Sequence, residues 1–285
     1  MPDAVPELHR FDADTVVTAA GAGRWIGEVS DRWDIGTVPN GGYVLAIALA
    51  GIRAAVTHPH PLTTTAHYLG PCAHGPVDID VDVVKEGRSL SSASARLSQH
   101  GRTRLLVVSS FSDLDAQEGP TVVTAAPPSL PDPDAYVASM EGRPTPFPIP
   151  PTITEQIEFR PSPESASSLL GSAKGDARLS GWIRFTDGRQ PDTACLPLFC
   201  DALPPAVFAA MFTGWVPTLE LTVHVRAVPA PGWIAAVASS RVIVDGLLEE
   251  DCELWDSDGQ LVAMSRQLAR VLQPAPGAST MSPNG

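Results

Sequence analysis

The 285-residue sequence is poor in positive charge. It has 19 Lys and Arg against 32 Asp and Glu, which gives a formal net charge of −13 at pH 7 and an isoelectric point of about 4.8. Duplex nucleic acid is bound through a basic surface that neutralises phosphates, and anionic membranes attract clustered Lys and Arg. The charge balance therefore argues against both classes of partner.

Long apolar runs are also missing. No stretch of 18 or more apolar residues occurs, so the sequence predicts no membrane span. The first residues are polar and acidic, without the basic and apolar segments of a secretory signal. We therefore expect a cytoplasmic protein.

Cysteine is scarce, and common catalytic motifs are absent. Cys72, Cys195, Cys200 and Cys252 form no CxxC pair and no zinc-ligand spacing with histidine, which favours buried, reduced thiols over a disulfide or a metal site. We predict neither a metal nor a resident cofactor. The sequence also lacks a GxSxG elbow, a P-loop and a GxGxxG loop, which argues against an α/β-hydrolase and against the common nucleotide sites.

Proline is abundant, with 29 residues, and its distribution suggests two modules. It is dense between residues 118 and 151, and proline is excluded from helix interiors and central strands. We predict an N-terminal module over 10–117, an extended linker over 118–151, a C-terminal module over 152–273 and a disordered tail over 274–285. A second segment, 162–176, which is rich in serine, is predicted to be a loop.

Each module is predicted to contain one helix followed by antiparallel strands. The helices are expected near 41–55, capped by Asn40, and near 203–213, opened by Asp201. Turn residues delimit strands at 63–69, 77–85, 90–99 and 104–111 in the first module. In the second, strands are expected at 152–159, 179–185, 218–226, 233–243, 248–256 and 261–268. The similar order, with Asn40 and Asp201 at equivalent helix starts, indicates an internal duplication.

Several motifs then resemble the proteins related to bacterial acyl-CoA thioesterase II. They are Trp33-Asp34-Ile35-Gly36, Pro39-Asn40-Gly41-Gly42-Tyr43, His67-Tyr68-Leu69-Gly70-Pro71 and Val84-Lys85-Glu86-Gly87-Arg88-Ser89. The resemblance implies an α+β fold of two tandem hotdog modules, each a long central helix wrapped by a curved antiparallel sheet. It also implies hydrolysis of a fatty acyl-CoA to free acid and CoA, with CoA as part of the substrate, and allows a homo-oligomer of double hotdogs.

The resemblance also assigns roles to residues. Asp201 matches the family aspartate that activates water, and Thr218 and Gln267 match the residues that hold this water. Thr222 stays a second possibility for the hydroxyl, because Glu220-Leu221 replaces the Asp-His of closer relatives. The expected substrate-binding residues are Asn40, Gly41, Gly42, Tyr43, Arg88 and Ser89, the helix start offering backbone donors and Arg88 with Ser89 meeting a CoA phosphate.

Each assignment has a simpler alternative. Asp201 and Asn40 are both preferred helix caps, and Arg88-Ser89 is also explained as an exposed turn. At the level of function, the alternatives are an enoyl-thioester hydratase or dehydratase on the same fold and a non-catalytic acyl-CoA-binding module. The hydratase chemistry usually pairs Asp with His, and no His lies close to Asp201 in the sequence.

Overall fold

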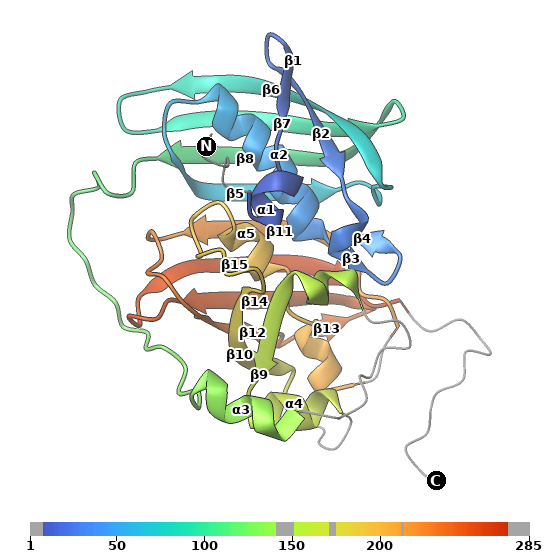
Figure 1. Cartoon of the computed structure of the whole chain (residues 1–285), viewed down its shortest axis with the longest axis vertical. Coiled ribbons are helices and arrows are strands. Elements are labelled where there is room, and N and C mark those ends of the chain that lie inside the picture. Colours follow the sequence, from blue (N-terminus) through green and yellow to red (C-terminus); the bar gives the residue numbers. More distant parts are fainter. Residues whose placement is uncertain (1–7, 141–150, 171–174, 212–213, 273–285) are drawn as a thin grey trace, which may run out of the picture.

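The computed structural model describes residues 8–140, 151–170, 175–211 and 214–272, which form a large antiparallel sheet with helices packed against it (Figure 1). The helices are α1 (Arg10–Asp14), α2 (Gly41–Ala55), α3 (Pro133–Met140), α4 (Pro163–Leu169) and α5 (Leu196–Cys200). The strands of the first half are β1 (Thr18–Gly21), β2 (Arg24–Val29), β3 (Asp34–Ile35), β4 (Val38–Pro39), β5 (His60–Tyr68), β6 (Gly75–Glu86), β7 (Ser91–Gln99) and β8 (Arg102–Ser112). Those of the second half are β9 (Ile157–Pro161), β10 (Arg178–Phe185), β11 (Thr218–Val225), β12 (Ile234–Ser239), β13 (Ile243–Val244), β14 (Leu247–Trp255) and β15 (Leu261–Arg270).

The spatial order of the strands in the large sheet is mirrored about the centre of the sheet. In the described residues, the order is β1-β2-β6-β7-β8-β5-β11-β15-β14-β12-β10-β9, with β13 on β14. Reading outward from the β5–β11 pair, β8 corresponds to β15, β7 to β14, β6 to β12 and β2 to β10. Because β5 and β11 pair antiparallel, the two halves share one continuous sheet. The Thr65 and Thr222 hydroxyls also meet across this seam at 2.9 Å.

Helix α2 is the long buried helix that the sequence predicts. The Asn40 side chain caps its start by accepting a hydrogen bond from the Tyr43 backbone N–H (2.9 Å), which satisfies one of the free donors of the first turn. Nearly all residues from Gly42 to Ile52 are buried, and α2 packs on β2, β5, β6, β7 and β8. A helix that is apolar around its circumference is stable only when enclosed in this way.

The prediction of a second helix at 203–213 is wrong. The second-half helix next to Asp201 is α5, five buried residues that end before this segment, and Asp201 is its C-cap rather than the first residue of a helix. Pro204 and Pro205 lack backbone N–H groups and prevent α5 from continuing, so that the described part of this segment, up to residue 211, contains only a short 3-10 turn at Ala206–Ala209. Asn40 and Asp201 are therefore not equivalent, since one precedes a helix and the other follows one.

Other differences are local. The single strand predicted over 152–159 is instead a 3-10 turn (Thr152–Glu155) followed by β9. The predicted loop at 162–176 contains α4, which Ser162 caps and Pro163 opens. Within the expected linker, residues 118–132 contain neither helix nor strand and run along the outside of the molecule to α3 (Figure 1). The predicted disordered tail lies outside the described residues.

The tight turns are where the glycine pattern places them. His100-Gly101 joins β7 to β8 with φ of 52° and 71°, and Asp245-Gly246 joins β13 to β14 with φ of 51° and 77°. Two consecutive residues with positive φ form a type I′ turn, whose twist matches that of antiparallel strands. Glycine is the preferred second residue because it adopts this conformation without steric cost.

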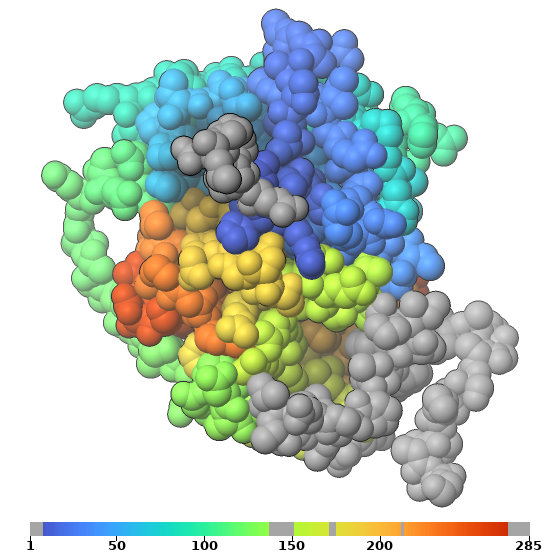
Figure 2. Space-filling view, viewed as in Figure 1, coloured from blue at the N-terminus to red at the C-terminus, as the bar shows by residue number. Residues whose placement is uncertain are grey.

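The two halves also contact each other away from the sheet. Figure 2 shows the dark blue N-terminal segment against the yellow segment near residue 190, where the buried Arg189 guanidinium donates to Asp12 (2.9 Å). All four cysteines are buried and free, as expected. None of the helices in the described ranges is long and apolar enough to cross a membrane.

Candidate active site

The start of α2 and the end of α5 meet at one point. Asp201 Oδ2 accepts a hydrogen bond from the Gly42 backbone N–H (2.7 Å) and another from Asn40 Nδ2 (3.2 Å). Asn40 Nδ2 also donates to the Asp201 carbonyl oxygen (2.9 Å). The Asn40 side chain thus caps α2 with its oxygen and holds Asp201 with its nitrogen. The cap interpretation of Asn40 is correct, but incomplete.

Glycine is required at the start of α2 by this close approach. A Cβ on Gly42 would lie 2.9 Å from Asp201 Cβ and 2.9 Å from Leu198 Cα, and one on Gly41 would lie 3.0 Å from Asp201 Oδ2. The backbone of Leu198 cannot move away without displacing α5. Any side chain at position 42 would therefore separate the two helices.

A second chain of hydrogen bonds runs from Thr218 into the sheet. The Thr218 hydroxyl donates to Gln267 Oε1 (2.7 Å), and Gln267 Nε2 donates to Glu250 Oε1 (2.7 Å). Glu250 Oε2 accepts a hydrogen bond from the Ala206 backbone N–H (2.5 Å). Gln267 and Glu250 are opposite each other in the β14–β15 register, so their side chains share one face of the sheet. Sequence reasoning missed Glu250, although its position on the same strand face as Leu248, Cys252 and Leu254 was a visible signal.

The carboxylates of this region are destabilised in their charged form. Burial raises the pKa of Asp201 from 3.8 to about 6, against the lowering effect of hydrogen bonds from Gly42 and Asn40 and of the nearby polar side chain of Thr218. Burial also raises the pKa of Glu250 to about 7, with a further contribution from the Asp201 charge. Asp201 is partly accessible as a residue, while its carboxylate is enclosed by protein. A carboxylate with a pKa near 6 is a stronger base than an ordinary one and is still ionised at neutral pH.

The two threonines considered for the hydroxyl role are in different surroundings. Thr218 interacts with both Asp201 and Gln267. Thr222 instead donates to Glu220 Oε1 (2.5 Å) and contacts Thr65 at the seam between the halves. The structure therefore brings Thr218, and not Thr222, together with Asp201 and Gln267.

Tyr68 is a second residue that sequence reasoning left without a role. Its ring carbons lie 3.1 and 3.2 Å from a Cβ placed on Gly41, next to Asp201 Oδ2. The phenol oxygen is buried and finds no hydrogen-bond partner among the described residues. Burial raises the pKa of Tyr68 well above its usual value, and the charges of Asp201 and Glu220 add to this effect. The hydroxyl is therefore a neutral donor beside the carboxylate.

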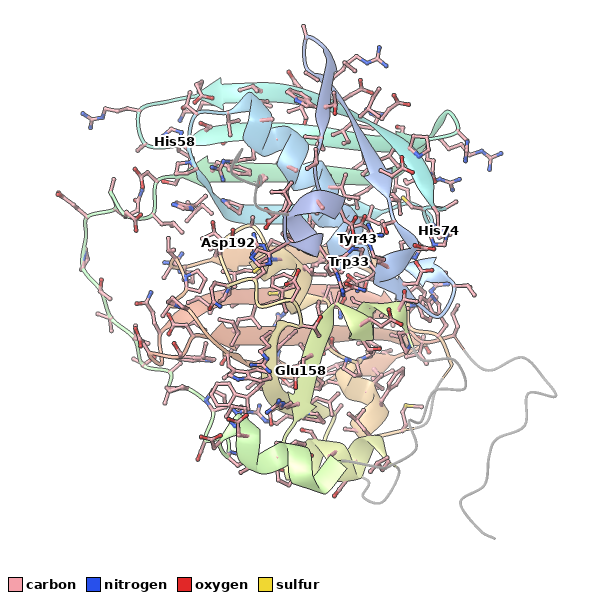
Figure 3. All side chains as sticks on the ribbon, in the orientation of Figure 1. Trp33, Tyr43, His58, His74, Glu158 and Asp192 are labelled. Carbon is pink, nitrogen blue, oxygen red and sulfur yellow. The ribbon has the colours of Figure 1, made fainter. Side chains whose placement is uncertain are left out.

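Tyr43, expected to bind substrate, is a core residue. Its side chain is fully buried and stacks on Trp33, with ring centroids 5.2 Å apart (Figure 3). The hydroxyl accepts from the Ser30 backbone N–H (3.0 Å) and lies 3.1 Å from the Asp14 carbonyl oxygen, to which it can donate. No surface remains for a substrate, so the role of Tyr43 is structural.

Arg88 and Ser89 are not near Asp201. They line a cavity of about 480 Å³ with Thr57 and His58, beyond the C-terminal end of α2. Asp201 lies at the opposite end of this helix, and 15 helical residues span roughly 20 Å. Figure 3 likewise shows His58 well away from Tyr43 in the first turn of α2. Both residues are at least partly exposed, and a contact with a CoA phosphate remains a prediction.

One group of side chains in the described residues has the types needed for a metal. His60, Asp113 and Asp115 place one ligand atom each within 4.8 Å of one another. His60 Nδ1 is already hydrogen-bonded to Thr193 Oγ1 (2.8 Å), and Asp115 is exposed. Asp113 lines the cavity of Arg88 and Ser89. The group therefore has no link to the chemistry of Asp201.

Comparison with known proteins identifies the family. The acyl-CoA thioesterase N-terminal domain matches residues 29–112, and the acyl-CoA thioesterase C-terminal domain matches residues 126–271. The chain belongs to the acyl-CoA thioesterase family. The resemblance seen in the sequence motifs is thereby confirmed.

Several solved structures and curated relatives are similar to the chain over most of its length. A protein from Thermobifida fusca that is assigned as a thioesterase II is 33% identical, with a TM-score of 0.83 over 94% of this chain and 99% of that chain. A conserved protein with a hotdog fold from Alicyclobacillus acidocaldarius is 24% identical, with a TM-score of 0.81 over 94% of this chain and 100% of that chain. An uncharacterized protein of Mycobacterium tuberculosis is 28% identical over 86% of this chain and 90% of its own length. The chain thus has the hotdog fold.

Proposed function

We propose that the protein hydrolyses acyl-CoA thioesters by direct attack of a water molecule that Asp201 activates. The observation that carries this proposal is the convergence of Asp201, Thr218 and Gln267 from three separate elements, beside the start of α2. In the expected role, Thr218 and Gln267 hold the water and Asp201 takes its proton. The family assignment supports a reaction on thioesters, and the geometry supports water as the nucleophile.

The proposed reaction has two steps. Water loses a proton to the Asp201 carboxylate while its oxygen bonds to the thioester carbonyl carbon, and the carbonyl oxygen becomes an oxyanion. Collapse of this intermediate restores the C=O bond and breaks the C–S bond. The proton on Asp201 passes to the departing sulfur, which leaves the carboxylic acid and the free CoA thiol.

The oxyanion requires donors that are not already in use. The Gly42 N–H, expected to contribute, instead donates to Asp201. We assign the task to the Gly41 N–H, which as the first helical amide has no intrahelical partner, and to the buried Tyr68 hydroxyl. Donors aimed at the charge that develops in the transition state are among the larger contributions to catalysis.

A covalent mechanism through Cys200 has less support. The thiol is adjacent in sequence to Asp201, but Cys200 is 5% exposed and interacts with Cys252 in the core. A nucleophilic cysteine needs access and a base or cation that favours the thiolate.

We also infer that the two halves are tandem hotdog modules. The mirrored strand order on either side of the β5–β11 pair supports this arrangement, as do the separate N- and C-terminal domain matches. The C-terminal match begins at residue 126, before α3. In this arrangement one module supplies the start of α2 and the other supplies Asp201, so a single site depends on both.

The test is a steady-state measurement of thiol release from acyl-CoAs of increasing chain length. We expect release of CoA with equimolar free acid, and an acid limb in the dependence of kcat/KM on pH. The same reactions, run with enoyl-CoA and followed by mass spectrometry, test for hydration. Tight binding of acyl-CoA without thiol release would instead support a non-catalytic binding module.

A further inference from the structure

Glu250 is a buried acidic residue with fixed partners, next to the residues that hold the proposed water. It is 5% exposed. One oxygen accepts from the Ala206 backbone N–H at 2.5 Å and the other from Gln267 Nε2 at 2.7 Å. A backbone amide can only donate, so the Glu250 oxygen facing Ala206 must accept. Both carboxylate oxygens are thus engaged by donors, which is the pattern expected of an ionised Glu250.

This contact determines the orientation of the Gln267 amide. An ionised carboxylate accepts hydrogen bonds and cannot donate them, so Gln267 must turn its NH₂ group toward Glu250. Its oxygen then faces Thr218, at 2.7 Å from the hydroxyl. Without Glu250, either orientation of the amide could bond to Thr218, because a hydroxyl both donates and accepts.

The orientation of Gln267 in turn determines that of the Thr218 hydroxyl. A threonine hydroxyl has one hydrogen and two lone pairs, and the hydrogen is donated to Gln267. The lone pairs are left for another donor. An attacking water has two O–H groups, of which Asp201 accepts one, and Thr218 can accept the other. A lone pair of the water is then free to attack the carbonyl carbon.

We propose that Glu250 is a positioning residue that, through Gln267, makes the Thr218 hydroxyl an acceptor for the attacking water. This inference rests on the proposed function, because it assumes that water bound by Asp201 and Thr218 is the nucleophile. It adds a residue that touches neither substrate nor water but sets the direction of a three-residue hydrogen-bond chain.

The charged groups around Glu250 should make kcat/KM depend on pH in a characteristic way. The titratable groups that interact electrostatically with Glu250 are Asp201 at the end of α5, and Glu249 and Cys252 on β14. Burial and the Asp201 charge raise its pKa to about 7, while that of Asp201 is about 6. The two carboxyl groups titrate as a coupled pair. If both must be ionised, the acid limb of log kcat/KM approaches a slope of two below about pH 6.

The test compares Glu250→Gln with Glu249→Gln in the full-length protein, using the thiol-release assay. A glutamine at 250 places its one oxygen toward either Ala206 or Gln267 and its NH₂ group toward the other, so one of these two donors loses its acceptor. We expect kcat to fall about ten- to hundredfold, as for a misdirected hydrogen bond in the transition state. KM should change less than about twofold, because Glu250 does not touch the substrate, and the acid limb should become single-proton.

Glu249 is the matched control. It is the neighbouring glutamate of β14, and it accepts hydrogen bonds from Arg241 and Ser240 near the surface. Glu249→Gln removes the same charge from the same strand without touching the chain from Glu250 to Thr218. We expect its kcat and the two-proton slope of its acid limb to match those of the wild type, with the limb moved slightly to lower pH because the Glu249 charge no longer raises the pKa of Glu250.

The possible results are distinguishable. Glu250→Gln with unchanged kcat, or a single-proton acid limb in the wild type, overturns the inference while leaving hydrolysis intact. The wild-type profile needs no variant, and so applies even if Glu250→Gln does not fold. Absence of turnover by the wild type overturns the proposed function and this inference with it.

Discussion

Replacing Asp201 with asparagine should make the protein more stable and much less active at neutral pH. Burial raises the pKa of Asp201 from 3.8 to about 6, so the ionised carboxylate costs folding free energy. Because the folded and unfolded pKa values differ by about 2, and each unit of difference corresponds to about 1.36 kcal/mol, the cost above pH 7 is about 3 kcal/mol. An asparagine side chain lacks this charge and can still accept a hydrogen bond from Gly42.

The pH dependence follows from the sign of the pKa change. Because the pKa of Asp201 is higher in the folded state, its ionisation destabilises the fold as the pH rises from about 4 toward about 6. The stability gained by Asp201→Asn should therefore be complete at about pH 8, about half as large at about pH 5 and small at about pH 4. Urea unfolding of both proteins at these pH values measures the difference.

Asp251 is a control, because its pKa is shifted in the opposite direction to that of Asp201. Its hydrogen bonds to Arg266, at 2.6 Å each, lower the pKa of this carboxyl group. Asp251→Asn should lower stability at about pH 8 and at about pH 5 alike, and its effect should shrink only below about pH 4, as the pH falls toward the lowered folded-state pKa and Asp251 is protonated. Activity should change little, because Asp251 lies outside the site.

Kinetics complete the test of Asp201. General-base assistance typically contributes ~10²–10⁴-fold, so Asp201→Asn should lower kcat by a factor in this range, with a smaller effect on KM. A variant that is less stable at pH 8 than the wild type would refute the electrostatic argument. A variant with full kcat would refute the role of Asp201 as base.

Three further substitutions test individual contacts. Tyr43→Phe should lower the free energy of unfolding in urea by about 1–3 kcal/mol, because the partly buried Ser30 N–H loses its acceptor, and unchanged stability would contradict the structural role. Tyr68→Phe should keep the stability but lower kcat about tenfold or more if the hydroxyl stabilises the oxyanion; an unchanged kcat would remove it from the site. Arg88→Ala should raise KM for acyl-CoA but not for an acyl-pantetheine lacking the nucleotide, and equal effects on both would exclude a phosphate contact.

Much of the fold was predictable because helix caps, apolar patterns and turn residues in the sequence coincide with the observed element ends and buried faces. Helix α2 has a capping asparagine and an apolar circumference, and the strands of the first half end at glycine turns. The helix of the second half was missed for a physical reason. Leu196–Cys200 is too short to show a helical period, while the prolines at 204 and 205 resemble a helix start, although in the fold they follow its end.

The candidate site was partly predictable. Asp201, Thr218 and Gln267 came from motif positions in the resembling family, and the structure brings them together. Glu250 and Tyr68 were not predictable in this way, because their roles depend on register across strands that are distant in sequence. Tyr43 was misassigned for the opposite reason: it lies beside the glycines in sequence, but the helix turns its side chain into the core.

The shortness of α5 explains how Asp201 reaches the start of α2. In the first half, the long buried helix α2 packs against α5 of the second half. In the second half, α5 ends after five residues, and Asp201 at its C-cap reaches the first turn of α2. The carboxylate there accepts from the Gly42 amide, where a helix N-terminus favours negative charge. A longer α5 would place a helical residue at this position and separate Asp201 from Gly42, so the two prolines that end the helix also help to form the site.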